Sequence, residues 1–194
     1  MRPMKSLLLF VVALVAFAPS ADAAPKKRYP FELTKVLVKP EVPADVAKEA
    51  QPRIEAVFKK ALEDNPQLVL SVEGAPDPDA NPAGYRKFLA KKGITAAYLV
   101  TVEVTEASIE IVPMEEKKNS QRISVSVGLH VLGETIPGRT MGFTGDGRAT
   151  VKQEVGMKVR DKDRQFTWDS AAETAVAEAL KECFAKLSKP QKKQ

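Results

Sequence analysis

Reactive and metal-binding side chains are scarce in this chain of 194 residues, which has one Cys, one His and one Trp. A disulfide scaffold needs paired cysteines, and a Cys/His metal site needs several such ligands. Histidine-based catalysis has a single candidate, His130. We therefore expect a non-enzymatic protein without cofactor or metal, and we assign no catalytic, cofactor-binding or metal-binding residue.

Extremes of composition and long apolar runs are also missing. Hydrophobic residues make up 44% of the chain and charged residues 28%, close to the globular average. This balance excludes a collagen-like or wholly disordered chain. The longest apolar run, 7–18, is shorter than the roughly 20 residues of a membrane-spanning helix. The length is sufficient for one domain with a real core.

The first 23 residues have the layout of a secretory signal peptide. Arg2 and Lys5 precede the apolar run, and small residues lead to a cleavage site near Ala23. We expect a periplasmic or secreted protein with no transmembrane segment after cleavage; the alternative is an uncleaved membrane anchor. No Cys near this site could accept a lipid.

The net charge of +5 belongs to the ends of the chain. A basic flexible arm is expected over 24–30 and a basic tail over 189–194, whereas the body between them has a slight acidic excess. Because no basic groove interleaved with aromatic residues accompanies these ends, we expect no nucleic-acid binding. Attachment of the ends to an anionic envelope polymer or lipid stays open, and high salt would then release the protein.

The residue patterns predict one α+β domain over 31–188, with the order β-α-β-α-β-β-β-α and a mixed sheet packed by helices. In chain order we expect a strand at 31–38, a helix at 45–64 kinked or begun at Pro52, a strand at 67–74, a helix at 82–92, a three-strand meander within 98–151 and a helix at 169–187.

The meander has the clearest pattern. Apolar residues alternate with polar ones from Ile123 to Val131, which indicates an antiparallel strand with one wet face. The alternation changes parity within 105–108, so we expect a bulge or turn there. The spacing of the glycines in 138–147 fits neither a P-loop nor the dinucleotide-binding fingerprint, so these glycines predict a bent, interrupted strand.

The segment before the last helix is predicted to be a long connection, mobile or in contact with a ligand, over 152–167. Asp45 is the expected N-cap of the first helix, and Ser170 with Glu173 fits a capping box at the start of the last. Cys183 falls on the apolar face of the last helix, which predicts a buried, inert thiol.

Several polar and aromatic residues are candidates for a functional role. His130 falls on the polar face of its strand, and we assign it no role; the strand glutamates Glu103, Glu106 and Glu110 receive none either. Trp168 and Phe166 are expected to staple the last helix to the core, the alternative being a partner-binding patch that could include Tyr98.

Asp77, Asp79 and Asn81 have the first spacings of a calcium-binding EF-hand loop. Pro82 stands where that loop needs Gly, and Phe88 where it needs Glu. The segment is therefore predicted to be a plain turn.

The element order and the junction LAKKGITAAYLV at 89–100 resemble a class of bacterial envelope modules. The class includes the TolB amino-terminal domain, the periplasmic domain of the curli-secretion channel and the lipoprotein activators of penicillin-binding proteins. There a helix ends at Gly, a short apolar strand follows and an Ala-rich helix, here 171–187, closes the domain. The resemblance implies non-enzymatic binding or assembly work in the envelope.

The sequence leaves three hypotheses for the function. The first is an exported binding or assembly module that contacts an envelope protein through a sheet edge or through 152–167. The second is an exported hydrolase centred on His130 or on the carboxylates. The third is a protein held to the envelope by its basic termini.

Overall fold

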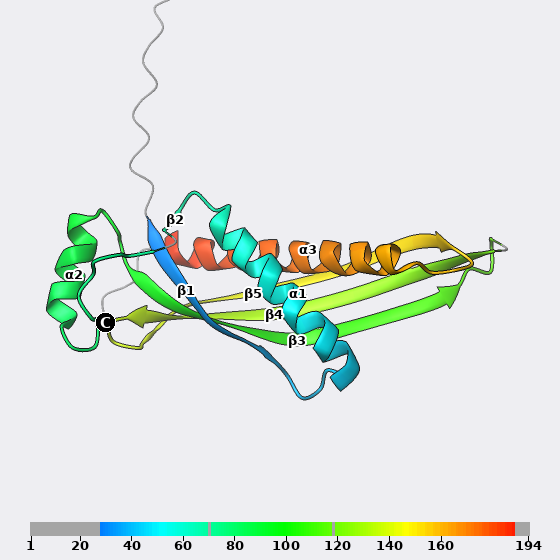
Figure 1. Cartoon of the computed structure of the whole chain (residues 1–194), viewed down its shortest axis with the longest axis horizontal. Helices are drawn as coiled ribbons and strands as arrows, with labels where there is room; N and C mark the ends of the chain where they lie inside the picture. Colours follow the sequence, from blue (N-terminus) through cyan, green and yellow to red (C-terminus); the bar gives the residue numbers. More distant parts are fainter. Residues whose placement is uncertain (1–27, 70, 118, 189–194) are drawn as a thin grey trace, which may run out of the picture.

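The computed structural model describes residues 28–69, 71–117 and 119–188 and shows an α+β domain in the predicted element order (Figure 1). The predicted signal peptide 1–23, residues 24–27 of the predicted arm and the predicted tail 189–194 lie outside the described residues. The elements are β1 Tyr29–Val38, α1 Ala44–Glu63, β2 Leu68–Val69, α2 Pro82–Lys91, β3 Ala97–Pro113, β4 Ser120–Ile136, β5 Met141–Gly156 and α3 Asp161–Ser188.

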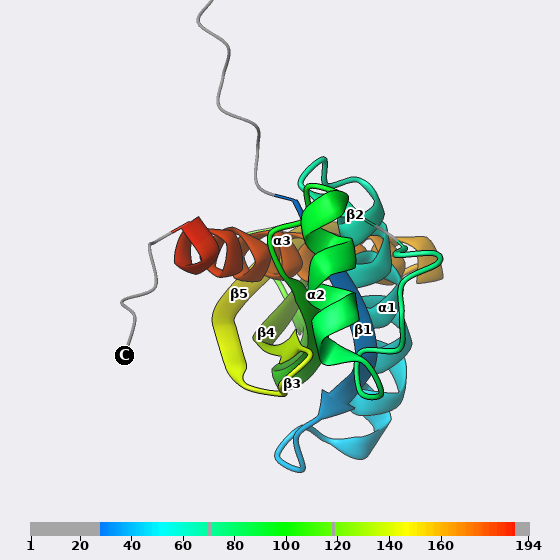
Figure 2. The same ribbon diagram turned by 90° about the vertical axis from the view of Figure 1, so that its left-hand side faces the viewer.

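The strands form one mixed sheet in the order β2-β1-β3-β4-β5. β1 runs parallel to β2 and β3, whereas β3, β4 and β5 form the predicted antiparallel meander. Seen along the long axis, the sheet curls around α3, with α1 beside it (Figure 2). α2 packs at one end of the sheet, where Ala97 and Ile136 belong to its own small apolar cluster. We call the surface away from α1 and α3 the outer face.

The main core lies between the curled sheet and the two helices. Ile123, Val125 and Val131 on β4 are fully buried, which confirms the predicted alternation. The β3–β4 register shifts between Val104 and Glu106, so the predicted bulge is present. The bulge adds one residue to β3, so the buried positions change from even numbers such as Val104 to odd numbers such as Ala107.

The N-terminal predictions need three corrections. β1 begins at Tyr29, so the last residues of the predicted arm belong to the sheet. α1 begins one residue before Asp45, which makes no capping hydrogen bond, and continues through Pro52. The second predicted strand shrinks to Leu68–Val69. In contrast, Asn81 caps α2 as its sequence position suggests, accepting a hydrogen bond from the Gly84 N–H.

The predicted connection 152–167 is wrong. β5 continues to Gly156 and α3 begins at Asp161, so only a short turn separates them. The capping box at Ser170 is wrong for the same reason. Asp163 reaches back to the Arg160 N–H at 3.3 Å, and its carboxylate also receives the Arg160 guanidinium at 2.7 and 2.9 Å. The sequence pattern did not reveal this first part of the helix, because only one narrow side of it is buried and the remaining residues are mostly charged or polar.

The glycines of β5 do not interrupt the strand; they let α3 approach it. A Cβ on Gly147 would lie 2.0 Å from the Ala175 carbonyl oxygen, and one on Gly145 would lie 2.4 Å from that of Ala179. Alanines fill the facing side of α3, including the fully buried Ala175 and Ala179. Small residues on both sides therefore bring a helix backbone against a strand backbone, and we call this contact the α3–β5 seam.

We predict that Gly147→Ala lowers the free energy of unfolding by about 2 kcal/mol or more, because the new methyl group meets backbone that cannot rotate away. Urea unfolding measures this change. Gly156→Ala is the matched control on the same strand, since no heavy atom lies within 4 Å of the place its methyl group would take; it should change stability by less than about 0.5 kcal/mol. Equal losses in both variants would contradict the seam's role.

Candidate functional site

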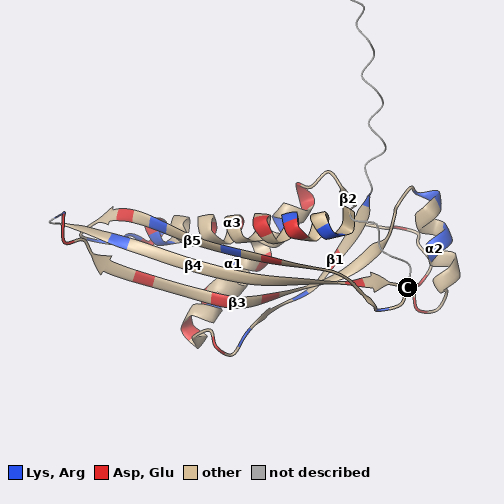
Figure 3. Ribbon diagram, turned by 180° about the vertical axis from the view of Figure 1, so that it is seen from behind, with Lys and Arg blue, Asp and Glu red and all other residues tan. Residues whose placement is uncertain are grey.

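The polar candidates of the meander lie on the outer face. Glu103 of β3 pairs with His130 of β4, and His130 pairs with Asp146 of β5, so the three side chains form one row across three strands. Glu106 and Glu110 follow along β3, where acidic residues recur in Figure 3. The structure thus brings the candidates His130 and Glu103 side by side and adds Asp146, which was not among the candidate residues.

His130 and Asp146 form a close pair, with 2.6 Å between Nδ1 and Oδ1. Asp146 stays largely exposed, and within the described residues no hydroxyl or thiol is hydrogen-bonded to the imidazole. Cys183 lies on the opposite, buried face, where loss of hydration raises its pKa to about 12. This confirms the predicted buried thiol, and it separates the thiol from the imidazole by the thickness of the sheet.

Carboxylates of α3 cover part of the β5 edge, an arrangement that sequence reasoning missed. Glu182 Oε2 accepts a hydrogen bond from the Asp146 N–H at 2.7 Å, and Glu178 Oε2 accepts one from the Arg148 N–H at 2.8 Å. Lys186 joins them by donating to Thr144 Oγ1 at 2.8 Å. The α3–β5 seam makes this possible, because only a close helix lets glutamates reach the strand edge. In the sequence, this arrangement is indicated only by the four-residue spacing of Glu178 and Glu182, which places both on the same side of a helix.

The rest of the same edge has no such cover. In an antiparallel strand, alternate residues direct both N–H and C=O to the same side. The backbone N–H groups of Asp146 and Arg148 point away from β4, so those of Thr150, Lys152 and Glu154 do as well. No described residue hydrogen-bonds to the N–H groups of these last three. We call the segment 150–154 the open edge.

Exposed apolar side chains accompany the open edge. Met157 directly follows β5 and is 66% exposed, and its carbonyl oxygen accepts a hydrogen bond from Gln121 Nε2 at 3.0 Å. Val112 and Ile111 of β3 are also exposed and lie at this end of the sheet, since Val112 pairs with Arg122 near the start of β4. The far end of the meander thus combines unpaired backbone with apolar surface.

The aromatic candidates do not form one surface. Trp168 is fully buried inside α3, whereas Phe166 two residues earlier is 60% exposed. Tyr98 packs edge-on against Phe31 and Phe143 in the core, and burial raises its pKa. Trp168 therefore anchors the helix to the core, although from within the helix rather than at its start.

The segment 77–81 is a turn, as predicted. Asp77 Oδ1 accepts hydrogen bonds from the N–H groups of Ala80 and Asp79, which lower the pKa of the Asp77 carboxyl. The described part of the chain holds no group of three or more His, Cys, Asp or Glu residues arranged to bind a metal ion. Nor does any helix within it have the length and apolar character needed to cross a membrane.

No family model matches this sequence, and no curated protein matches it. Among solved structures, the rare lipoprotein B from Shewanella oneidensis is 9% identical with a TM-score of 0.40, covering 80% of this chain and 94% of its own. A minor lipoprotein from Acinetobacter baumannii is 12% identical with a TM-score of 0.40, covering 85% and 98%. A hypothetical protein from Chlamydia trachomatis is 14% identical with a TM-score of 0.38, covering 83% and 93%.

These neighbours include bacterial lipoproteins, and none of the three is a TolB or curli-secretion domain. Likeness at such identities and scores assigns neither a family nor an activity to this chain.

We predict that Glu182→Gln weakens the acid dependence of stability. Lys186 and the Asp146 N–H lower the pKa of the Glu182 carboxyl in the folded protein. Its contribution is therefore fully present above the ordinary Glu pKa of 4.5 and is lost as the pH falls through the lowered folded value. Urea unfolding at neutral and acidic pH should show a smaller difference for this variant than for the wild type.

The control for this experiment is Glu173→Gln, an exposed position on the same helix with no hydrogen bond to β5 among the described contacts. It should keep the wild-type acid dependence. An unchanged acid dependence in Glu182→Gln would show that the carboxylate contributes nothing at the strand edge.

Proposed function

We propose that this protein is an exported, non-enzymatic binding module of the bacterial envelope that pairs with an extended segment of a partner protein along the open edge. The observation that carries the proposal is the run of outward N–H and C=O groups at 150–154, which have no described partner. Addition of a strand from another protein would satisfy these groups, the mode known as β-augmentation. The predicted signal peptide supports an exported location, and the sequence resemblance to envelope modules supports the kind of partner.

The contrast within β5 supports a functional reading of the open edge. Proteins protect exposed strand edges because such edges pair with other chains. Here Glu178 and Glu182 cover the first half of the edge, and Lys152 is the only cation on the open half. The exposed Met157 beside it offers apolar area to an incoming segment.

A proline at residue 152 tests the open edge directly. Lys152 directs its N–H away from β4, so Lys152→Pro removes an edge donor without removing a β4–β5 hydrogen bond. We expect this variant to lose capture of its envelope partner in an immobilised-protein binding assay. Lys152→Ala, which removes the charge and keeps the N–H, should retain capture.

Three results would oppose the proposal. Capture that survives Lys152→Pro, in a variant whose thermal unfolding resembles that of Lys152→Ala, places the partner elsewhere. Capture that both variants lose points to the charge of Lys152 rather than to strand pairing. Release by high salt or by deletion of 189–194 would instead favour attachment through the basic tail.

The His130–Asp146 pair favours a second candidate, an exported hydrolase using the imidazole as a general base. That candidate predicts that His130→Ala abolishes activity in a hydrolase screen. The binding-module proposal predicts that the same variant unfolds like the wild type and still captures the partner, because His130 lies on the outer face away from the open edge. A hydrolytic activity lost in His130→Ala would decide for the second candidate.

A further inference from the structure

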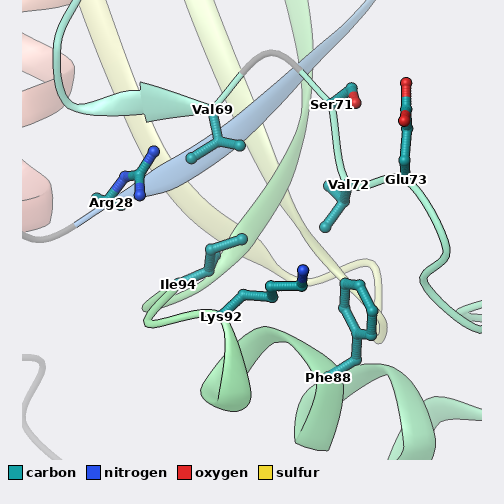
Figure 4. A pocket seen from close by; sticks show the side chains of 8 residues that line it. All are labelled: Arg28, Val69, Ser71, Val72, Glu73, Phe88, Lys92 and Ile94. Carbon is teal, nitrogen blue, oxygen red and sulfur yellow. The ribbon is translucent and has the colours of Figure 1, made fainter.

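A pocket at the α2 end of the molecule lies where three parts of the chain meet (Figure 4). Arg28 just before β1, Val69 at the end of β2 with residues 71–73, and the C-terminal end of α2 surround a volume of about 340 Å³. Such a volume falls within the range of small-molecule sites. The lining residues are Arg28, Val69, Ser71, Val72, Glu73, Phe88, Lys92 and Ile94.

Four apolar side chains form one part of the pocket wall, beside polar and charged ones. Ile94 is buried, and Val69, Val72 and Phe88 are half-buried. In Figure 4 the side chains of Val72 and Ile94 are directed into the space between the loop and α2. Val72 and Phe88 also pack against the small core beneath α2, so this wall is held by tertiary contacts. An open apolar surface at a partly enclosed site favours the hydrocarbon part of a ligand.

Two cations border the apolar surface. Figure 4 shows Arg28 on one side and Lys92 on the other, with Glu73 directed away from both Lys92 and Phe88. Among the described residues, neither Arg28 nor Lys92 has a carboxylate within 4.0 Å, and Lys92 Nζ lies 5.7 Å from the centre of the Phe88 ring. Basic side chains without acidic partners beside a pocket attract an anion, and hydrogen bonds to a charged group are the stronger kind.

We propose that this pocket binds a small amphiphilic acid, with its anionic head between Arg28 and Lys92 and its short apolar chain against Val72 and Phe88. The head is a carboxylate or a phosphate ester, because both accept hydrogen bonds from guanidinium and ammonium groups. The site is separate from the open edge, which lies at the far end of the meander (Figure 1).

Isothermal titration of the purified protein lacking the predicted signal peptide, with three matched probes, tests the ligand class. We expect hexanoate or hexyl phosphate to bind and hexyltrimethylammonium not to bind. A preference for hexanoate identifies a carboxylate head, and a preference for hexyl phosphate identifies a phosphate head. Binding of the cationic probe as tightly as the acids, or no binding of either acid, would overturn the proposal.

Charge-removing variants locate the head group. Lys92→Gln and Arg28→Gln should each weaken binding of the preferred acid about tenfold, the loss typical of one hydrogen bond to a charged group. Lys91→Gln is the matched control, since it removes an exposed cation from the adjacent position without touching the pocket. An equal loss of binding in Lys91→Gln would show that the effect depends only on the net charge of the protein, and it would contradict the proposed site.

A spectroscopic readout keeps the test independent of variant stability. On adding the preferred acid to the wild type, NMR signals from the methyl groups of Val72 and Ile94 and from the Phe88 ring should shift, whereas those of Val112 at the other end of the sheet should stay in place. Shifts distributed over both ends would contradict a single site. Partner capture by the open edge should be the same in Lys92→Gln as in the wild type, so either proposal can fail alone.

Discussion

The α3–β5 seam is the contact on which the rest of this structure depends. The Ala175 and Ala179 carbonyl oxygens lie where side chains on Gly147 and Gly145 would begin. Because the two backbones touch, the sheet can curl around α3 and bury its alanine-rich side. The same proximity lets Glu178 and Glu182 reach the edge of β5. Core packing and edge protection thus have one cause, the absence of side chains at two positions.

The helices also decide which surfaces remain available. α1 and α3 take one face of the sheet and α2 packs at one end (Figures 2 and 3). The polar side chains of the meander therefore stay on the outer face. The cover that α3 gives to the edge of β5 ends at Arg148. The open edge lies at one end of the long axis and α2, which contributes to the pocket of Figure 4, lies at the other (Figure 1). This separation would let a protein contact and a small ligand be bound independently.

Local patterns predicted much of the fold. Alternation from Ile123 to Val131 follows from one buried face, and Asn81 before Pro82 is a strong helix start. The first part of α3 and the continuity of β5 were missed. Charged residues there resembled a connection, and glycines resembled breaks, because sequence patterns do not record what packs against a backbone. The pocket was missed for a similar reason, since Arg28 and Lys92 are far apart along the chain.

The sequence by itself determined the fold class, the element order, the bulge in β3 and the burial of Cys183, because each depends on the spacing of apolar residues within one segment. The tertiary structure alone decided that His130 meets Asp146, that glutamates of α3 cover part of the β5 edge, and that two cations border one pocket. Each of these joins segments brought together by packing. Which residues of distant segments meet depends on how helices and strands pack against one another. In the sequence, this packing is indicated only by the small side chains that allow close approach.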